Sequence, residues 1–383
     1  MLSHLILTSL LTASLGGASE AQSLAASGEC AVSASGCTVS PGDKVVSSFQ
    51  MYPENGEPDD KRCRICFSAV YNSTVVCWGP ADNKTEVLNV SGLSGRPELH
   101  ASGVRIDSSG DNLYIMINAG DAFVTQGKNI KGENNLVKWN LNEPDQEKAK
   151  ECVVNLSEFT DGAFGGFQDM AFSKDGKVFI ISTFPAGIFI ADADCGNVRK
   201  WWSGPNTDPT IAGLAGLARY GDNAMVVLDA TVPGGQLLRF DDTTAETGTD
   251  HKIEIRAAEP GGNTSFGAIL EAMSLPAKYG GKVALLSSNQ DGTHVCRTSD
   301  DWRSADFLGT IPNPLTASEG ASTVAAVEAG GRIFRVNEYF NDVNETVPNT
   351  LAGPRSDFPL QDITDSIDKL LERPPTPSSC QGS

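Results

Sequence analysis

The sequence predicts an all-β fold, a six-bladed β-propeller, and two observations carry this prediction. Helical periodicity is nearly absent before the last residues, whereas short apolar alternations separated by Gly, Asp and Asn run through the chain, as in β-strands. One plan also recurs at intervals of about 45 to 65 residues, in which a glycine-containing hairpin turn is followed by a strongly apolar strand. These turns contain Gly110, Gly176, Gly221, Gly280 and Gly330. With the segment 63–90 they make six units, as in a propeller, whereas the alternative, a pair of β-sandwiches, would lack the repeated plan.

The repeats divide the chain into a signal peptide (1–21), a cysteine-containing segment (22–44), the propeller (45–368) and a Pro- and Ser-rich tail (369–383). The stretch 356–363 is expected to close the ring against the N-terminal blade, and 365–371 to form a short helix. The six blades are expected at 45–93, 99–158, 166–205, 211–257, 266–312 and 320–365.

The first 21 residues indicate a secretory leader, because an apolar run is followed by small residues around Ala18 and Ala21. Nine cysteines follow this leader and predict a disulfide framework with at least one thiol left over or bonded to another chain. Cys63 and Cys66 form a CxxC motif, but no second CxxC or histidine pair accompanies it, which disfavours a zinc or redox site. Cys30 is expected to pair locally with Cys37, or the two to staple their segment to the ring. We therefore expect a protein of the secretory pathway, either secreted or vesicular.

The net charge, the hydropathy and the sequons of the chain indicate which kinds of partner and modification to expect. A net charge of −19 disfavours nucleic acid, which is bound by clustered Lys and Arg. No apolar run after the leader is long enough to span a membrane, and we expect a monomer. Six sequons are candidate glycosylation sites on surface loops and outer edges: Asn72, Asn83, Asn89, Asn155, Asn263 and Asn344.

The axis of the ring is where a ligand site is expected, because the innermost strand of each blade lines it. Polar residues at equivalent repeat positions should therefore converge there, although a polar residue after a strand also simply begins a turn. From these positions we predict Glu271 and Asp229 as catalytic acids. Substrate-binding residues are predicted at repeat positions and among nearby aromatics: His100, Asn118, Phe123, Gln168, Phe184, Asn289 and Glu338.

Standard catalytic motifs are missing from the sequence. It contains no GxSxG, HExxH, P-loop or GxGxxG pattern, and His100, His251 and His294 are far apart along the chain. We expect no metal and no cofactor, with an axial calcium ion on Asp229 and Glu271 as an open alternative. Any catalysis should therefore rest on one or two proton-moving groups and a shaped apolar pocket.

Several segments resemble one fungal family and cover most of the chain after about residue 60: 102–104 with Asn118-Ala119, 164–169, 301–305, and 355–360 with 365–367. The family is that of the Malassezia propeller allergen, with relatives in fungal biosynthetic clusters, among them the trichothecene-cluster propeller protein and the hetero-Diels-Alderases of tropolonic sesquiterpenoid pathways. The resemblance implies a secreted six-bladed propeller with an axial cavity for a hydrophobic ligand. It assigns no catalytic residues.

Three functions follow as hypotheses. The first is a cyclase of fungal terpenoid or meroterpenoid metabolism, in particular a hetero-Diels-Alderase that joins a dehydrated quinone methide to a sesquiterpene alkene, or a ring-closing protein of a trichothecene-like pathway. The substrate would be a hydrophobic small molecule derived from a terpene or polyketide. The second is a secreted propeller that binds lipid or phosphoinositide without catalysis, with Arg96, Arg105 and Arg355 as candidate phosphate ligands. The third is a metal-dependent lactonase or esterase.

Overall fold

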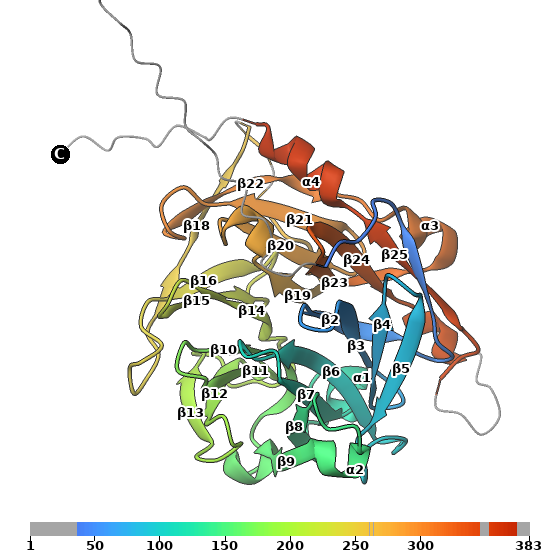
Figure 1. Cartoon of the computed structure of the whole chain (residues 1–383). Coiled ribbons are helices and arrows are strands. Elements are labelled where there is room, and N and C mark those ends of the chain that lie inside the picture. The colour runs from blue at the N-terminus through green and yellow to red at the C-terminus, as the bar shows by residue number, and fades with distance from the viewer. Residues whose placement is uncertain (1–36, 260, 263, 345–351, 374–383) are drawn as a thin grey trace, which may run out of the picture. The chain divides into compact units, whose positions relative to one another are not determined.

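The computed structural model describes residues 37–344, except 260 and 263, and residues 352–373. These described residues form six β-sheets arranged as a six-bladed propeller, which confirms the predicted fold (Figure 1). In each sheet the strands follow one another antiparallel from the innermost strand to the outermost, with one added parallel strand in blade 5.

The blades are made of the following strands. Blade 1 holds β2 (Pro53–Asp59), β3 (Arg64–Ala69), β4 (Thr74–Gly79) and β5 (Lys84–Asn89), and blade 2 holds β6 (Leu99–Ile106), β7 (Asn112–Ala119), β8 (Asn134–Asn140) and β9 (Lys150–Asn155). Blade 3 holds β10 (Gly165–Phe172), β11 (Val178–Phe184), β12 (Gly187–Ala191) and β13 (Arg199–Ser203), and blade 4 holds β14 (Leu214–Tyr220), β15 (Ala224–Asp229), β16 (Gln236–Phe240) and β17 (Asp250–Lys252). Blade 5 holds β19 (Leu270–Ser274), β20 (Val283–Ser288), β21 (Gly292–Arg297), β22 (Ser304–Ile311) and β18 (Glu254–Ala257), and blade 6 holds β23 (Ser322–Ala329), β24 (Arg332–Glu338), β25 (Asp357–Asp362) and β1 (Lys44–Ser47).

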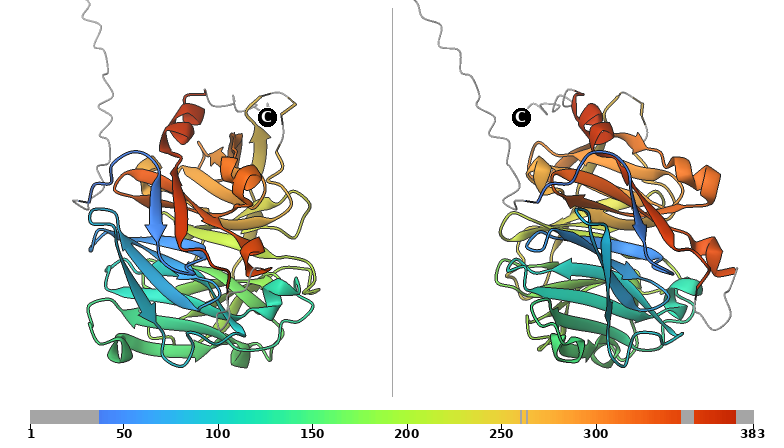
Figure 2. Two further views of the ribbon diagram at one scale, coloured as in Figure 1. Left: turned by 90° about the vertical axis from the view of Figure 1, so that its right-hand side faces the viewer. Right: turned by 45° about the vertical axis from the view of Figure 1, so that its right-hand side comes forward.

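Two blade boundaries differ from those expected. β1 is the outer strand of blade 6, where it pairs antiparallel with β25, so residues 45–47 do not belong to the first blade. The two ends of the chain thus close the ring within the last blade, and Figure 2 shows β1 and β25 side by side. β18 pairs parallel with β22 and so extends blade 5, although it follows blade 4 in sequence.

Short helices lie in connections between strands and, in one case, after the last strand. The described helices are α1 (Asp121–Val124), α2 (Gln146–Ala149), α3 (Pro314–Glu319) and α4 (Thr364–Leu371), with 3-10 turns η1 (Leu156–Phe159), η2 (Ala277–Tyr279) and η3 (Phe340–Asn344). α4 is the helix expected near the C-terminus, and it packs on β22 with its buried Ile367. None of the helices in the described ranges has the length and apolar character needed to cross a membrane.

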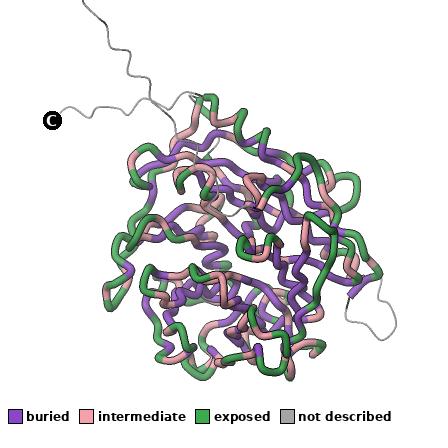
Figure 3. The backbone as a smooth tube through the Cα atoms, viewed as in Figure 1, coloured by how far each residue is buried: buried purple, intermediate pink, exposed green. Residues whose placement is uncertain are grey.

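The hydrophobic core is divided among the junctions between blades. Each of six buried clusters joins two neighbouring blades; one, for example, brings Phe67 and Val76 of blade 1 against Phe334 and Phe358 of blade 6. This division arises because a blade is a sheet that buries both of its faces, one against each neighbour. Burial is therefore continuous along the central strands and is lost at the turns (Figure 3).

Three disulfides lie within the described residues: Cys37–Cys63, Cys66–Cys77 and Cys152–Cys195. The two cysteines of the CxxC motif thus bond to different partners, and Cys37 staples the N-terminal segment to blade 1. Cys296 is a buried free thiol, whereas Cys30 and Cys380 fall outside the described residues.

Candidate functional site

Each of the six innermost strands has a β-bulge in its pairing with the second strand of its blade. A bulge leaves a residue out of the ladder and re-aims its side chain, and bulges are common beside active sites. Neighbouring innermost strands also contact one another around a closed ring, which Figure 1 shows at the centre of the molecule. The first bulged residues, in blade order, are Glu54, Ser102, Gln168, Ala215, Glu271 and Val324.

Glu271 reaches across the axis of this ring. The Gln168 Nε2 atom of blade 3 donates a 2.8 Å hydrogen bond to Glu271 Oε2 of blade 5, so the contact passes over blade 4. Thr183 Oγ1 lies 3.0 Å from Gln168 Oε1 and fixes the orientation of that amide. The Asn289 amide is a second hydrogen-bond donor to the Glu271 carboxyl. Glu271 is therefore held by two amides from different blades.

Three carboxyl groups from blades 1, 5 and 6 interact here. Burial raises the pKa of Glu271 to about 7, while the hydrogen bonds from Asn289 and Gln168 oppose the rise. Burial and the neighbouring Glu271 and Glu338 carboxyls raise the pKa of Glu54 well above its usual range. Burial likewise raises the pKa of Glu338. Like-charged neighbours in a dry site hold on to protons, so this cluster contains protonated acids near neutral pH.

Several polar atoms of this cluster lack a partner. Among the described residues, neither carboxyl oxygen of Glu338 has a hydrogen bond of normal geometry, and the same holds for Glu54 Oε2 and Asn289 Oδ1. Glu338 is nonetheless fully buried, and the Tyr71 hydroxyl and the charge of Arg355 only oppose the rise of its pKa that burial causes. Unsatisfied buried polar groups are costly, and in native proteins they commonly mark a place where a ligand or water binds.

Aromatic side chains flank the carboxyl cluster on the side of blades 1 and 6. The Tyr71 ring packs edge-to-face on both Tyr52 and His100, with 5.4 Å between ring centroids in each pair. Burial lowers the pKa of His100, so the imidazole is neutral near pH 7. The Arg355 guanidinium stacks on Tyr339, with its central carbon 3.5 Å from the centroid of the aromatic ring. Tyrosine and arginine side chains thus lie together on this side of the propeller.

Of the residues predicted from repeat position, Gln168, Glu271, Asn289 and Glu338 come together in this cluster, and His100 adjoins it through Tyr71. Glu54 and Tyr71 were missed. Glu54 occupies in blade 1 the bulge position that Gln168 and Glu271 occupy in their blades, so extending the repeat comparison to the polar stretch 53–59 would have found it.

Four other predicted residues have different surroundings. Asp229 accepts hydrogen bonds from the Thr231 backbone and from Gln236 Nε2, and so organises the turn after β15. Asn118 donates to Ser102 Oγ and to the Phe167 carbonyl, which ties the bulge of blade 2 to blade 3. Phe123 and Phe184 form an edge-to-face pair with centroids 5.9 Å apart, beside Gly166 at the start of β10.

The predicted sequons lie mostly on turns and strand ends. Asn72 and Asn83 lie in two of the three hairpin turns of blade 1, Asn89 ends β5, and Asn155 ends β9 and caps η1. Asn263 falls outside the described residues, as does the side chain of Asn344.

Arg105 forms a second layer of contacts behind the carboxyl cluster. Its guanidinium donates to Asn55 Oδ1 at 3.2 Å and to Asp169 Oδ2 at 2.7 Å. Asn55 and Asp169 are the second bulged residues of blades 1 and 3, so each directly follows a residue of the axial set, Glu54 or Gln168. Burial raises the pKa of Asp169 to about 6, and Arg105 opposes the rise. Arg105 therefore clamps two bulges together from the blade between them.

A bound metal ion needs several ligand side chains around one point. Across the described ranges, no three His, Cys, Asp or Glu side chains are grouped so as to hold a metal ion. Asp229 and Glu271, the ligands of the calcium alternative, make separate hydrogen bonds to amide groups. The described residues do not provide the oxygen cage that calcium requires.

Comparison with known proteins places the chain among fungal relatives, although no family model matches it. It is 31% identical over 351 residues to trichothecene biosynthesis protein 14 of Trichoderma arundinaceum, covering 86% of this chain and 90% of the relative. It is 30% identical over 351 residues to core trichothecene cluster protein 14 of Fusarium sporotrichioides, covering 86% and 87%.

Solved structures agree on the fold. The Malassezia sympodialis allergen Mala s 1 superposes with a TM-score of 0.68 at 18% identity, covering 85% of this chain and 96% of the allergen. A luciferin-regenerating enzyme superposes with a TM-score of 0.53 at 12% identity, covering 84% and 95%. At these identities the two structures establish the propeller fold alone. The sequence relatives go further, and they show that the chain belongs to the family of the fungal trichothecene-cluster protein 14, as its resemblance predicts.

Proposed function

We propose that this protein catalyses ring closure of a hydroxylated terpenoid in fungal secondary metabolism, by acid-assisted loss of water. The observation that carries the proposal is the meeting of three buried carboxyls, Glu54, Glu271 and Glu338, with raised pKa values and with unpartnered oxygens. Buried groups with strongly shifted pKa values are typical of catalytic sites. The relatives' names, which refer to trichothecene biosynthesis, support a sesquiterpenoid substrate.

In the proposed reaction Glu271 is the acid. Its proton passes to a hydroxyl of the substrate, the C–O bond breaks, and water leaves behind an allylic cation. A second hydroxyl oxygen of the substrate then bonds to the cationic carbon and closes the ring. The proton of that hydroxyl returns to the Glu271 carboxylate, so the net change is the loss of one water molecule.

The surroundings of Glu271 suit this cycle, because both of its protonation states are accessible near neutral pH. Burial favours the acid, while the hydrogen bonds from Gln168 and Asn289 favour the carboxylate. A general acid works best when its pKa lies near the working pH. Glu54 and Glu338 supply hydrogen bonds to the other hydroxyls, and any negative charge on them stabilises the cation.

The hetero-Diels-Alder reaction is a second form of the same chemistry. It would begin with the same loss of water but give a quinone methide, which then adds to the alkene of a second molecule. The acid cluster serves that first step equally well. The names of the relatives favour closure within one sesquiterpenoid, and the two forms differ in requiring one substrate or two.

Lipid headgroup binding has less support from the side chains. Arg355, one of the three candidate phosphate ligands, donates to Asp342 Oδ2 at 2.6 Å and stacks on Tyr339, and Arg96 and Arg105 also bond to carboxylates. A phosphate at this position would have to displace a carboxylate that already satisfies the guanidinium.

We also infer that the protein follows the secretory route and is a monomer. The three disulfides favour folding in an oxidising compartment. The predicted leader lies outside the described residues.

The test of the ring-closing function is a stereochemical product assay. Purified protein is incubated with a sesquiterpenoid that carries an allylic alcohol and a second free hydroxyl, with and without an added alkene partner. We expect one stereoisomer of the cyclic ether, and a rate lower by about 10²- to 10⁴-fold in Glu271→Gln.

Asp229→Asn is the matched control, because it changes an acid that bonds to the following turn. It should retain activity if the acid is Glu271. A product mixture identical to that formed without protein would refute the function, and a product formed only with the alkene would favour the hetero-Diels-Alder form.

A further inference from the structure

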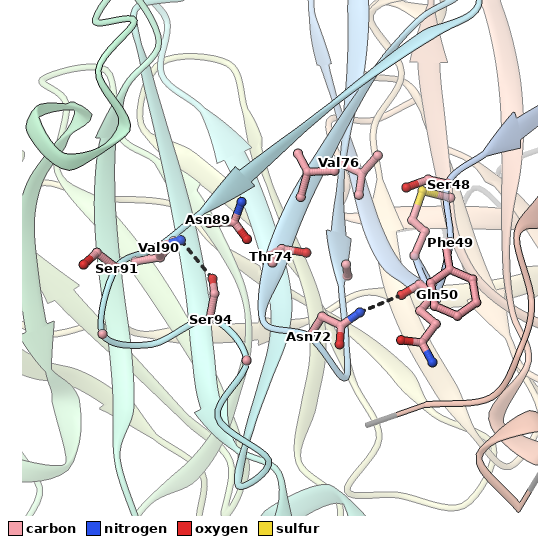
Figure 4. Close-up of a pocket in the computed structure, with 15 residues that line it drawn as sticks. Ser48, Phe49, Gln50, Asn72, Thr74, Val76, Asn89, Val90, Ser91 and Ser94 are labelled. Atoms are coloured by element: carbon pink, nitrogen blue, oxygen red, sulfur yellow. Dashed lines mark hydrogen bonds between the residues drawn. The ribbon is translucent and has the colours of Figure 1, made fainter. Parts of the chain in front are cut away.

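A groove lies on the outer side of the ring, where the connection from blade 6 enters blade 1, and it encloses about 370 Å³. Figure 4 shows Ser48, Phe49 and Gln50 on one wall and the segment after β5, with Ser91 and Ser94, on the other. The floor is one face of the blade-1 sheet, because Thr74 pairs with Asn89 and Val76 pairs with Val87, and paired residues project to the same side.

Two apolar side chains along this groove face solvent. The Phe49 residue is 56% exposed and Val87 is 40% exposed. Exposed apolar surface that lines a concave site commonly marks a place that a partner covers. Neither Phe49 nor Val87 belongs to the axial cluster, so the proposed reaction does not explain their exposure.

Two of the six sequon asparagines, Asn72 and Asn89, also line this groove. Asn72 is half-buried, and its Nδ2 atom donates a 3.3 Å hydrogen bond to the Gln50 carbonyl, as Figure 4 shows. N-glycosylation replaces one of the two hydrogens on Nδ2 and leaves the other. The bond to Gln50 can therefore persist while the sugar extends along the groove.

We propose that the groove is the seat of the chain's own N-glycan, attached at Asn72. The first N-acetylglucosamine lies over Thr74 and Val76, and its C–H face packs against the Phe49 ring. Asn89 also lines the groove and is exposed at the end of β5, so the experiments below are chosen to separate a sugar on Asn72 from one on Asn89. The proposal rests on the secretory route and is independent of the ring-closing reaction.

The first experiment maps the used sequons. The full chain with its own leader is produced in a glycosylating fungal host, and the glycans are removed enzymatically in heavy-oxygen water, which marks each used asparagine by mass. Asn72 should be marked in nearly every molecule. An unmarked Asn72 overturns the proposal.

The second experiment asks whether the sugar contacts Phe49. Thr74→Ser keeps the sequon, whereas Thr74→Val destroys it without touching Asn72, so the two variants form a matched pair with and without the glycan. Phe49→Ala is then added to each. In the Thr74→Ser chain it should lower the melting temperature by about 2 °C. In the Thr74→Val chain it should have almost no effect, because Phe49 is mostly exposed there.

Equal effects of Phe49→Ala in the two chains would overturn the proposal, since Phe49 would then act without the sugar. A groove covered instead by a second copy would also overturn it, and would be recognised by a dimer mass that Phe49→Ala abolishes in the Thr74→Val chain.

Discussion

Removal of the Arg105 guanidinium tests whether its contacts with two bulges hold the side chains of the axial cluster in position. Arg105 is the cation that faces Asp169, a carboxylate with no exposed side-chain surface. In Arg105→Met the Asp169 carboxylate remains buried in the bulge of blade 3 without its ion pair, and Asn55 loses a partner in blade 1. Both bulges are then free to shift, and Glu54 and Gln168 shift with them.

The magnitude follows from the burial of Asp169. Its pKa is already raised from 3.8 to about 6 with Arg105 present, which corresponds to about 3 kcal/mol of stability lost once the pH rises above about 6. Breaking a buried ion pair typically costs about 3 to 5 kcal/mol. In Arg105→Met the pKa of Asp169 rises further, so at pH 5 the group takes up a proton and escapes most of the penalty. The loss should be about 3 kcal/mol or more at pH 8 and clearly smaller at pH 5.

Urea unfolding at the two pH values, followed by tryptophan fluorescence, measures this difference. Adding Asp169→Asn to Arg105→Met should restore part of the stability at pH 8, since it removes the buried Asp169 charge and leaves only Glu57, 3.5 Å from Arg105 in the wild type, without its cation. Arg105→Lys keeps a cation but cannot reach both bulges at once, so it should retain stability better than activity. Equal losses at pH 5 and pH 8, or no recovery in the double variant, would refute the clamp.

Three further predictions follow from other contacts. The ring-closing rate should fall as the pH rises above about 7, because Glu271 then loses its proton. Because the pKa of Glu271 is raised in the folded protein, ionisation of this group costs stability as the pH rises through 7. Unfolding measured at pH 5 and pH 8 should therefore show Glu271→Gln gaining stability relative to wild type as the pH rises. Arg335→Lys should lower the free energy of unfolding, measured by chemical denaturation, by about 2 kcal/mol. The buried guanidinium donates to the Ile311 and Pro312 carbonyls and to the side chains of Thr293 and Gln361, and one ammonium group cannot reach all four acceptors. Gly216→Ala should lower the free energy of unfolding by about 1 to 3 kcal/mol and reduce activity. A Cβ at this position would lie 2.4 Å from Met273 N, in the strand that bears Glu271. A variant that unfolds and reacts like the wild type would contradict this.

The fold could be predicted because blades repeat, and a repeat is visible in one sequence. The strand–turn–strand plan around Gly110 and its equivalents gave the number of blades. The placement of β18 could not be predicted in this way, because Glu254–Ala257 follows blade 4 and its partner β22 lies about 50 residues further along. β1 was misassigned for the same reason, since its partner β25 lies at the other end of the chain.

Which side chains come together in the candidate site was predictable where repeat position alone decides it. Gln168, Glu271, Asn289 and Glu338 follow from equivalent places in their blades. Asp229 shows the limit of this reasoning, because it too is an acid that ends a second strand, yet Thr231 and Gln236 in the next turn bind its carboxylate. Glu54 was missed because β2 is a polar strand, PENGEPD, in which no alternation marks the inward face.

The bulges explain how one propeller can hold an asymmetric site on a symmetric ring. Each innermost strand presents a first bulged residue, and its chemistry differs from blade to blade. In blades 2, 4 and 6 the positions carry Ser102, Ala215 and Val324, which have little acid–base chemistry. Two of the acids, Glu271 and Glu54, are the bulged residues of blades 5 and 1, whereas Glu338 ends the second strand of blade 6. The amide of Gln168 bonds to Glu271 from blade 3. In the proposed reaction the leaving hydroxyl must therefore point toward blades 5, 6 and 1. The rest of the substrate lies toward the side without acids, and this single orientation is what would select one stereoisomer of the closed ring.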